Sequence, residues 1–252
     1  MKPLYTKFLF YCLTNLFILC FHIPLLGNSS EDKATNQDLQ VIKAVKPILP
    51  ANVAKTGVTE GFAIIVLIVD NKGLQKEFVE FAASHPAFAR STIRAIKRWE
   101  FTPRIVNGAA YASRVFVKAS YSLENGGGGV VDASIIDEAM FKNKTINRSL
   151  FMVSDINELD HEPKISKSIS PVYPAEMREV EASGQVLVEF FIDTTGKVKA
   201  PGIKSSSNDY FAVAALTAIK EWRFQSPMKR SKRVTARAYQ PFFFEYKHFD
   251  NN

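Results

Sequence analysis

The sequence has 252 residues, of which 46% are hydrophobic and 23% are charged, and its net charge is +7. These values fit one or two globular domains and exclude a disordered chain, a collagen-like repeat and a multi-span membrane protein. The two cysteines, Cys12 and Cys20, both lie near the N-terminus. A structural disulfide, a zinc–thiolate site or a cysteine nucleophile is therefore excluded from the remainder of the chain.

Residues 8–27 contain no charged side chain and follow Lys2 and Lys7. A basic lead before an apolar segment is typical of a secretory signal or of an N-terminal membrane anchor. Pro24 and the small Gly27 favour a signal that is cleaved, and twenty apolar residues also suffice to cross a bilayer. Both alternatives stay open for residues 1–27, and either one predicts that the rest of the chain is exported.

The next part of the chain shows the patterns of strands and one helix. The predicted elements are strands at 62–70, 74–81 and 110–121 and a helix at 87–99, which follows Pro86. The strand at 62–70 is apolar on both of its faces, which is typical of a strand that is buried on both sides. We therefore expect its second face to be covered by a later part of this chain or by another chain.

The same series of elements occurs again after residue 165. Strands are predicted at 186–192, 197–203 and 234–246, a turn at 193–196 and a helix at 209–223. The helix follows from apolar residues spaced by three and four, and the strands from alternation. Pro201 and Gly202 predict a shortened or bulged second strand.

The two series are copies of one unit with an offset of 123 residues. Trp99 and Trp222, the only tryptophans of the chain, stand at this offset. The other matched pairs are Gly61 and Gly184, Phe88 and Phe211, Ala95 and Ala218, Ile96 and Ile219, and Phe101 and Phe224. Such a set indicates an internal duplication. We expect a first repeat at 41–123, a connector at 124–164 and a second repeat at 165–247.

The connector opens with four glycines at 126–129 and carries four basic and eight acidic side chains. The glycines favour a flexible hinge. Apolar groups at 130–131, 135–136 and 150–153 predict that part of the connector packs. Because both repeats are basic, the acidic connector is expected to lie against them.

Several motifs of the second copy occur in a fixed order. They are Pro171-Val172-Tyr173-Pro174, Gly184-Gln185-Val186, Asp193-Thr194-Thr195-Gly196-Lys197-Val198, Ala214-Ala215, Ile219-Lys220-Glu221-Trp222-Arg223-Phe224 and Pro227. In this order they resemble the C-terminal domain of the TonB family of energy transducers. The first copy resembles it less well, with Leu49 in the place of Tyr173. The resemblance implies an α+β fold of two repeats, each a small antiparallel sheet in strand–strand–helix–strand order with one helix packed on one face.

The resemblance also implies a location and a partner. The location is the periplasm of a Gram-negative bacterium, with residues 8–27 as an inner-membrane tether if they are retained. The partner is an envelope protein or an outer-membrane receptor peptide, added as a strand to the sheet edge that we expect along 234–246. The candidate partner-binding residues are Pro171, Val172, Tyr173, Pro174, Val234, Ala236, Ala238 and Gln240.

Each of these assignments has a structural alternative. Tyr173 and its prolines also suit an entry segment that packs on the helix. Arg233 and Arg237 also suit an edge that is guarded by charge, and Pro241 has no N–H for pairing. The basic residues Lys229, Arg230, Lys232 and Arg233 are typical of a solvated hairpin tip, and a membrane-surface contact is the sharper interpretation.

No catalytic or metal-binding arrangement stands out, so the sequence predicts no enzyme, cofactor or metal. Nucleic-acid binding is not expected from an exported chain whose basic run has no interleaved aromatic residues. The primary hypothesis is an exported TonB-like protein that binds an extended peptide and acts in TonB-dependent transport. An anchored energy transducer and a scaffold protein that forms homodimers through strand edges are the alternatives.

Overall fold

The computed structural model describes residues 36–55, 58, 60–106, 108–123, 129–136 and 150–246. Residues 34–252 belong to one compact unit. The predicted signal or anchor at 8–27 and the glycines at 126–128 lie outside the described residues. None of the helices in the described ranges is long and apolar enough to span a membrane.

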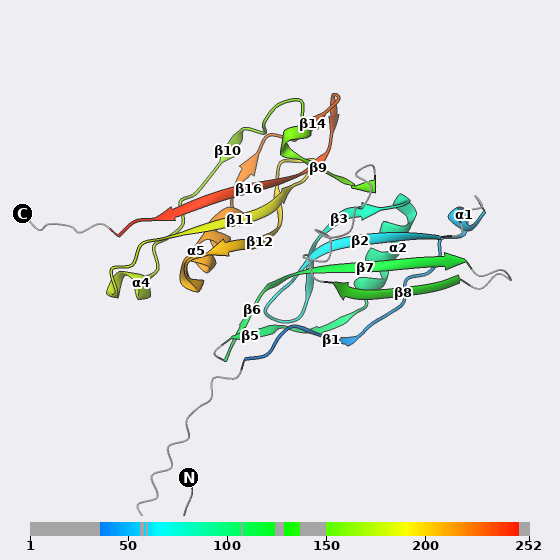
Figure 1. Cartoon of the computed structure of the whole chain (residues 1–252), viewed down its shortest axis with the longest axis horizontal. Coiled ribbons are helices and arrows are strands. Elements are labelled where there is room, and N and C mark those ends of the chain that lie inside the picture. The colour runs from blue at the N-terminus through cyan, green and yellow to red at the C-terminus, as the bar shows by residue number, and fades with distance from the viewer. Residues whose placement is uncertain are drawn as a thin grey trace, which may run out of the picture. The chain divides into compact units, whose positions relative to one another are not determined.

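The first repeat is built on a four-stranded antiparallel sheet in the order β3-β2-β7-β8 (Figure 1). Its strands are β2 (Glu60–Val69), β3 (Gln75–Ala83), β7 (Ser113–Leu123) and β8 (Gly129–Ile136). Helix α2 (Pro86–Ile96) packs on one face and is capped by His85, whose ring nitrogen accepts a hydrogen bond from the backbone N–H of Ala87. The smaller elements are β1 (Gln40–Lys43), α1 (Ala51–Ala54), β4 (Glu100–Thr102), β5 (Arg104–Val106) and β6 (Ala109–Tyr111).

The second repeat has the same plan, with the sheet order β12-β11-β16-β9. Its strands are β11 (Gly184–Ile192), β12 (Val198–Ser206), β16 (Thr235–Phe244) and the short β9 (Val153–Asp155), which runs parallel to β16. Helix α5 (Asp209–Lys220) covers one face. The smaller elements are η2 (Ile156–Glu158), β10 (Ile165–Lys167), α4 (Ala175–Glu179), β13 (Arg223–Phe224), β14 (Met228–Lys229) and β15 (Lys232–Arg233).

The predicted duplication is visible in the hydrogen bonds of both repeats. The indole N–H groups of Trp99 and Trp222 donate to the carbonyls of Val45 and Ile169, at 2.8 Å in each case. Gly73 and Gly196 have φ angles of +80° and +84°, and an added Cβ would meet the backbone oxygen of Phe101 or Phe224 at 2.3 or 1.9 Å. Both turns therefore require glycine.

The α+β class and the strand–strand–helix–strand order are confirmed, whereas the C-terminal boundaries of the two helices differ from the prediction. Helices α2 and α5 end at Ile96 and Lys220, about one turn earlier than expected, because the chain turns into β4 and β13. The bulge predicted near Pro201 and Gly202 is confirmed by register shifts between β11 and β12.

The prediction that β2 is buried on both faces is also confirmed. We call the sheet face opposite the helix the helix-free face. In the first repeat it contributes Ile64, Val66 and Ile68 to a buried cluster. The remaining members come from the rest of repeat 1, from the connector and from repeat 2: Val79, Phe81, Ala82, Phe116, Val153, Phe191 and Ala200. The second repeat and the connector therefore supply the cover.

Candidate functional site: the edge of β16

The last strand of the second repeat is paired differently along its two halves. Strand β9 pairs with residues 235–237, so the expectation that the last strand is a sheet edge is wrong there. Beyond Arg237, no strand within the described part of the chain pairs with the side of β16 that is turned away from β11. We call this side, over residues 238–244, the β16 edge.

The register with β11 shows which backbone groups the β16 edge presents. Gln185 lies opposite Phe243, but its N–H and C=O groups are both hydrogen-bonded to Ser207, at 3.0 Å. Phe243 must then direct its own N–H and C=O away from β11. Pro241, two residues earlier, has the same orientation, and its missing N–H costs no bond to β11. The carbonyl of Pro241 accepts a hydrogen bond of 2.8 Å from the side chain of Gln240.

An apolar stripe accompanies the β16 edge on the helix-free face. Tyr239 and Phe243 are 45% and 69% exposed, and Pro241 between them is also exposed. On the opposite face, Ala238, Phe242 and Phe244 are buried in the core with α5. An incoming strand would thus meet a closed core on one side and exposed apolar rings on the other.

The corresponding edge of the first repeat is occupied. Strand β8 runs antiparallel to β7 and pairs with residues 116–123, which correspond to 239–246 at the offset of 123. Val131 of β8 is buried in the core of the first repeat. The two repeats therefore differ at this edge. In the first repeat, strand β8 of the connector pairs with it.

A buried ion cluster lies where the repeats meet. Glu189 of β11 is 1% exposed, and its carboxylate receives Arg114 of β7 at 2.8 Å and the hydroxyl of Tyr239 at 2.7 Å. Lys204 and Arg237 lie at 3.8 Å. The backbone N–H of Ala200 also donates to Glu77 of the first repeat, at 2.8 Å. These bonds tie the strand that carries Tyr239 to the first repeat.

The acidic connector contacts the second repeat as predicted. Asp155 pairs with Arg237 at 2.8 Å. Burial lowers the pKa of an arginine, but the hydrogen bond to Asp155 and the nearby Glu189 outweigh it and raise the pKa of Arg237 above its ordinary value. Glu158 pairs with Lys229 at 2.7 Å.

The basic segment predicted as a hairpin tip forms the turn between β14 and β15. Backbone N–H groups of Ser231 and Arg230 donate to Asp160 and lower the pKa of that carboxyl group. Lys229 is engaged with Glu158, whereas Arg230, Lys232 and Arg233 are exposed. A membrane contact through this tip stays a prediction.

The motif at 171–174 lies next to the C-terminal end of β16. The ring of Tyr173 lies 5.7 Å from that of Phe211 and 6.3 Å from that of Phe244. Its hydroxyl donates to the carbonyl of Ala182. The ring of Tyr173 thus packs against helix α5, as the structural alternative expects, and partner binding by this motif stays a prediction. Val172 is exposed, and the two flanking prolines are half-buried.

The other candidates lie on β16 or just before it, and their side chains differ in exposure. Ala236 and Ala238 are buried, and Ala236 is paired on both sides. Val234 and Gln240 are half-buried. Sequence reasoning missed Tyr239 and Phe243, which alternation along the strand could have placed on the exposed face.

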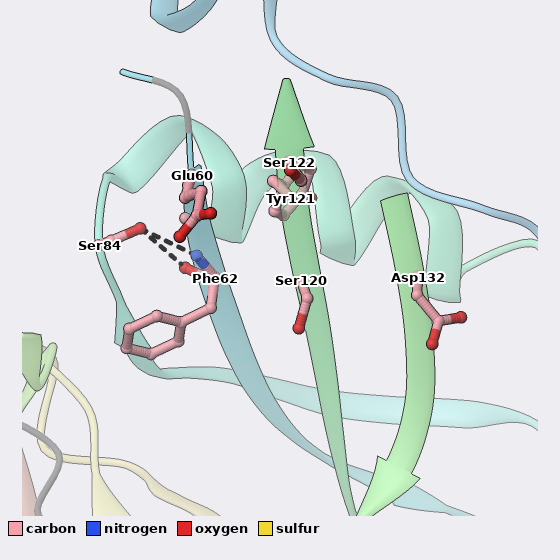
Figure 2. A pocket seen from close by; sticks show the side chains of 8 residues that line it. Glu60, Phe62, Ser84, Ser120, Tyr121, Ser122 and Asp132 are labelled. Carbon is pink, nitrogen blue, oxygen red and sulfur yellow. Dashed lines mark hydrogen bonds between the residues drawn. The ribbon is translucent and has the colours of Figure 1, made fainter. Parts of the chain in front are cut away.

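A second candidate site is a pocket of about 500 Å³ at one end of the first sheet (Figure 2). Its lining is Glu60, Gly61, Phe62, Ser84, Ser120, Tyr121, Ser122 and Asp132. Figure 2 shows Glu60 and Asp132 on opposite sides of β7, with carboxylates that do not point toward one another. Ser84 is engaged with the backbone of Phe62. Among the described residues no group of three or more His, Cys, Asp and Glu side chains suits a metal ion. The pocket therefore offers no convergent set of reactive groups.

Two copies of a small α+β unit, each with one helix on a mainly antiparallel sheet, define a tandem-repeat protein. The model of the family described as Gram-negative bacterial TonB protein C-terminal matches residues 45–123 and 169–246, more than half of the chain. The chain belongs to this family.

Two known proteins illustrate the similarity of parts of the chain to other members of this family. Protein TonB of Vibrio cholerae serotype O1 (strain ATCC 39315 / El Tor Inaba N16961) is 28% identical over 99 residues, which are 39% of this chain and 40% of that protein. The match thus spans less than half of the relative. The solution NMR structure of the Pseudomonas aeruginosa TonB CTD is 26% identical, with a TM-score of 0.32, and the match covers 39% of this chain and 97% of that one.

Proposed function

We propose that this protein binds an extended segment of a partner protein along the β16 edge and acts in TonB-dependent transport across the envelope of a Gram-negative bacterium. The observation that carries the proposal is the difference between the two edges. Strand β8 pairs with the edge of β7, whereas no described strand pairs with the β16 edge. A sheet edge with outward N–H and C=O groups can be completed by a strand from another chain.

The proposed partner is a segment of an outer-membrane receptor or of another envelope protein, reached from the periplasm. Membership of the TonB C-terminal family supports this class of partner. The segment at 171–174 is proposed as a second contact, because Tyr173 lies beside Phe244 and leaves Val172 exposed. Val234 and Ala236 precede the β16 edge, and Ala238 and Gln240 direct their backbone groups toward β11, so these four residues are proposed to position the strand and not to contact the partner through their backbone.

Site-specific photo-crosslinking in cells tests the proposal. A benzophenone amino acid is placed at Phe243 and, in a matched control, at Ser120, which holds the equivalent position on the occupied edge. Crosslinks from position 243 to a single extended segment of an outer-membrane protein are expected, with few from position 120. Equal crosslinking at both positions contradicts the proposal, and crosslinked dimers of the chain favour the scaffold alternative instead.

A further inference from the structure

We propose that strand β8 is the interface of a homodimer, in which its outer edge pairs antiparallel with β8 of a second copy about a two-fold axis at Ala133. The proposal goes beyond the proposed function, because it concerns an edge of the first repeat and a different partner. Strand β8 lies between the segments 45–123 and 169–246 that match the family model. The interface is thus a feature of this chain and does not follow from its family.

Strand β8 is the outermost strand of the first sheet (Figure 1), and no strand in the described ranges pairs with its outer side. The hydrogen bonds of the neighbouring strands show which backbone groups this side presents. Phe62 exchanges hydrogen bonds with Ser84, so Ser120, which lies opposite Phe62 on β7, directs its N–H and C=O groups toward β8. Asp132, opposite Ser120, and Ser134 therefore direct theirs toward β7. The backbone groups that point outward are those of Val131, Ala133 and Ile135.

The outer edge of β8 carries none of the features that protect exposed edges. Lysines, prolines and bulges commonly keep such edges from pairing with another chain. Strands β3 and β12, which end the two sheets on the other side, have them: Lys76 in β3, Lys199 and Pro201 in β12, and register shifts in both. The residues of β8 include no lysine, arginine or proline, and their register with β7 has no shift. Such an edge is a template for another strand.

The sequence of β8 is complementary to itself when the strand is paired about Ala133. Ala133 then lies opposite its own copy, and Val131 lies opposite the partner's Ile135. The outward backbone groups meet at each of these pairs, as an antiparallel ladder requires. Between them, Asp132 lies opposite the partner's Ser134, whose hydroxyl donates to the carboxylate. Apolar side chains thus meet apolar ones, and the polar pair forms a hydrogen bond.

The charge of Asp132 selects this register. An axis one residue earlier places Asp132 opposite its own copy, and like charges directly opposite one another are destabilising. An axis one residue later places Asp132 opposite the partner's Ile136, which leaves the carboxylate without a donor. Of these three axes, only the one at Ala133 gives the carboxylate a hydrogen-bonding partner.

The side chains along this edge are accessible to a second copy. Asp132 and Ser134 are exposed, and Ile135 is 38% exposed although it is apolar. The partner's Val131 would cover Ile135 and extend the apolar core that Val131 and Ala133 already join. The first sheets of the two copies would then form one continuous sheet.

Disulfide crosslinking of the purified full chain tests the register. Asp132 and the partner's Ser134 form a non-hydrogen-bonded pair, whose Cα atoms lie about 4.5 Å apart, within the range that a disulfide spans. The test variant carries Asp132→Cys and Ser134→Cys, with alanine in place of Cys12 and Cys20. Oxidation should give a covalent dimer on a non-reducing gel.

The matched control for the crosslink carries Lys118→Cys and Ser120→Cys. These two residues have the same spacing on β7, where β8 covers the edge. This variant should stay monomeric on the gel. Equal crosslinking by both cysteine pairs, or no dimer from the pair on β8, overturns the proposal.

Sedimentation equilibrium of the full chain tests the affinity. The wild type should dimerise reversibly, and Ile135→Pro, which removes one outward N–H from each copy, should weaken the dimer about ten-fold or more. Ile135→Lys is a second variant that keeps the N–H and places a charge on the edge. Ile42→Lys, at another exposed isoleucine, is the control and should leave the dimer intact. A wild type that is monomeric at roughly 100 µM, or a dimer that neither Ile135 variant weakens, overturns the proposal.

Discussion

Val66 and Glu189 occupy equivalent positions in the two repeats, and both side chains are buried. Val66 joins a wholly apolar cluster, whereas Glu189 gathers Arg114, Lys204 and Arg237 around its carboxylate. The helix-free face of the first repeat is buried by packing, whereas the side chains of Tyr239 and Phe243 on the same face of the second repeat stay exposed. One copy of the duplicated unit thus uses its helix-free face for packing inside the chain, and the other leaves part of that face exposed.

The largest effect is expected from Glu189→Ala. This change removes the carboxylate from Arg114, which is itself 8% exposed in its side chain, and it leaves a buried positive charge. Breaking a buried ion pair by removing one partner costs about 3–5 kcal/mol. Urea denaturation of the full chain should show this loss of unfolding free energy. Glu158→Ala, at the half-exposed pair with Lys229, is the control and should cost less than about 1 kcal/mol.

The double variant Glu189→Val with Arg114→Met sharpens the same comparison. It gives the second repeat the residue that the first has at this place and removes Arg114, the most buried of the three cations around Glu189. Apolar replacement of a complete buried pair is often neutral or stabilising. Most of the loss should therefore be recovered. A double variant as unstable as Glu189→Ala would contradict the explanation that the loss comes from the unpaired charge of Arg114.

The next effect in size tests what the repeats share. Gly73→Ala and Gly196→Ala should each lower the unfolding free energy by at least about 2 kcal/mol, because both turns have positive φ and no room for a Cβ. Gly108→Ala is the control, since its φ is also positive but no atom lies within 4 Å of the added Cβ. Unequal losses at Gly73 and Gly196 would show that the two turns are not equivalent.

The framework that the two repeats share could be predicted, because its turns and hydrogen bonds restrict which residue types can stand at particular positions. A turn that needs glycine, or an indole whose N–H needs a carbonyl, allows few substitutes, so the pairs at 123 residues persisted. The burial of Glu189 could not be predicted in this way. Its neighbours on the same face, Gln185 and Leu187, indicate partial exposure. Its burial depends on Arg114, which lies 75 residues away.

The edge itself could be predicted only in part. The alternation of side chains along the strand predicts β16. It does not predict β9, because three residues are too few to show an alternation. The pairing of Asp155 with Arg237 joins residues 82 apart, with no turn between them to indicate register. The pairing of β8 with the edge of β7 could not be predicted for a similar reason. The apolar residues of the connector predict that it packs, but they do not indicate which strand it packs against.

Ser134→Pro tests the occupied edge directly. By the alternation described above, the N–H of Ser134 donates to β7, and its removal should cost about 1–2 kcal/mol. Hydrogen exchange should speed up in residues 116–120 of β7. Ile135→Pro is the matched control, because its N–H points away from β7 and its side chain is also exposed. Equal exchange in both variants would contradict the assigned alternation.

The smallest difference lies in the two equivalent turns. Hydrogen bonds outweigh partial burial and lower the pKa of both Asp70 and Asp193. Asp193 accepts an additional bond of 2.6 Å from the hydroxyl of Thr195, where the first repeat has Lys72. Asp193→Ala should therefore cost about 1 kcal/mol at pH 7, and Asp70→Ala less.

The sign of the pH dependence follows from the lowered pKa. A carboxyl group whose pKa is lower in the folded protein stabilises it above the unfolded value, about 3.9, and this contribution is lost as the pH falls through the folded value. The stability difference between wild type and Asp193→Ala should shrink below about pH 4. Asp193→Asn keeps an acceptor oxygen without a titrating proton, so it separates the turn geometry from the charge. If its stability falls with acid as steeply as that of wild type, then Asp193 is not a source of the pH dependence, and the two turns differ in hydrogen bonding alone.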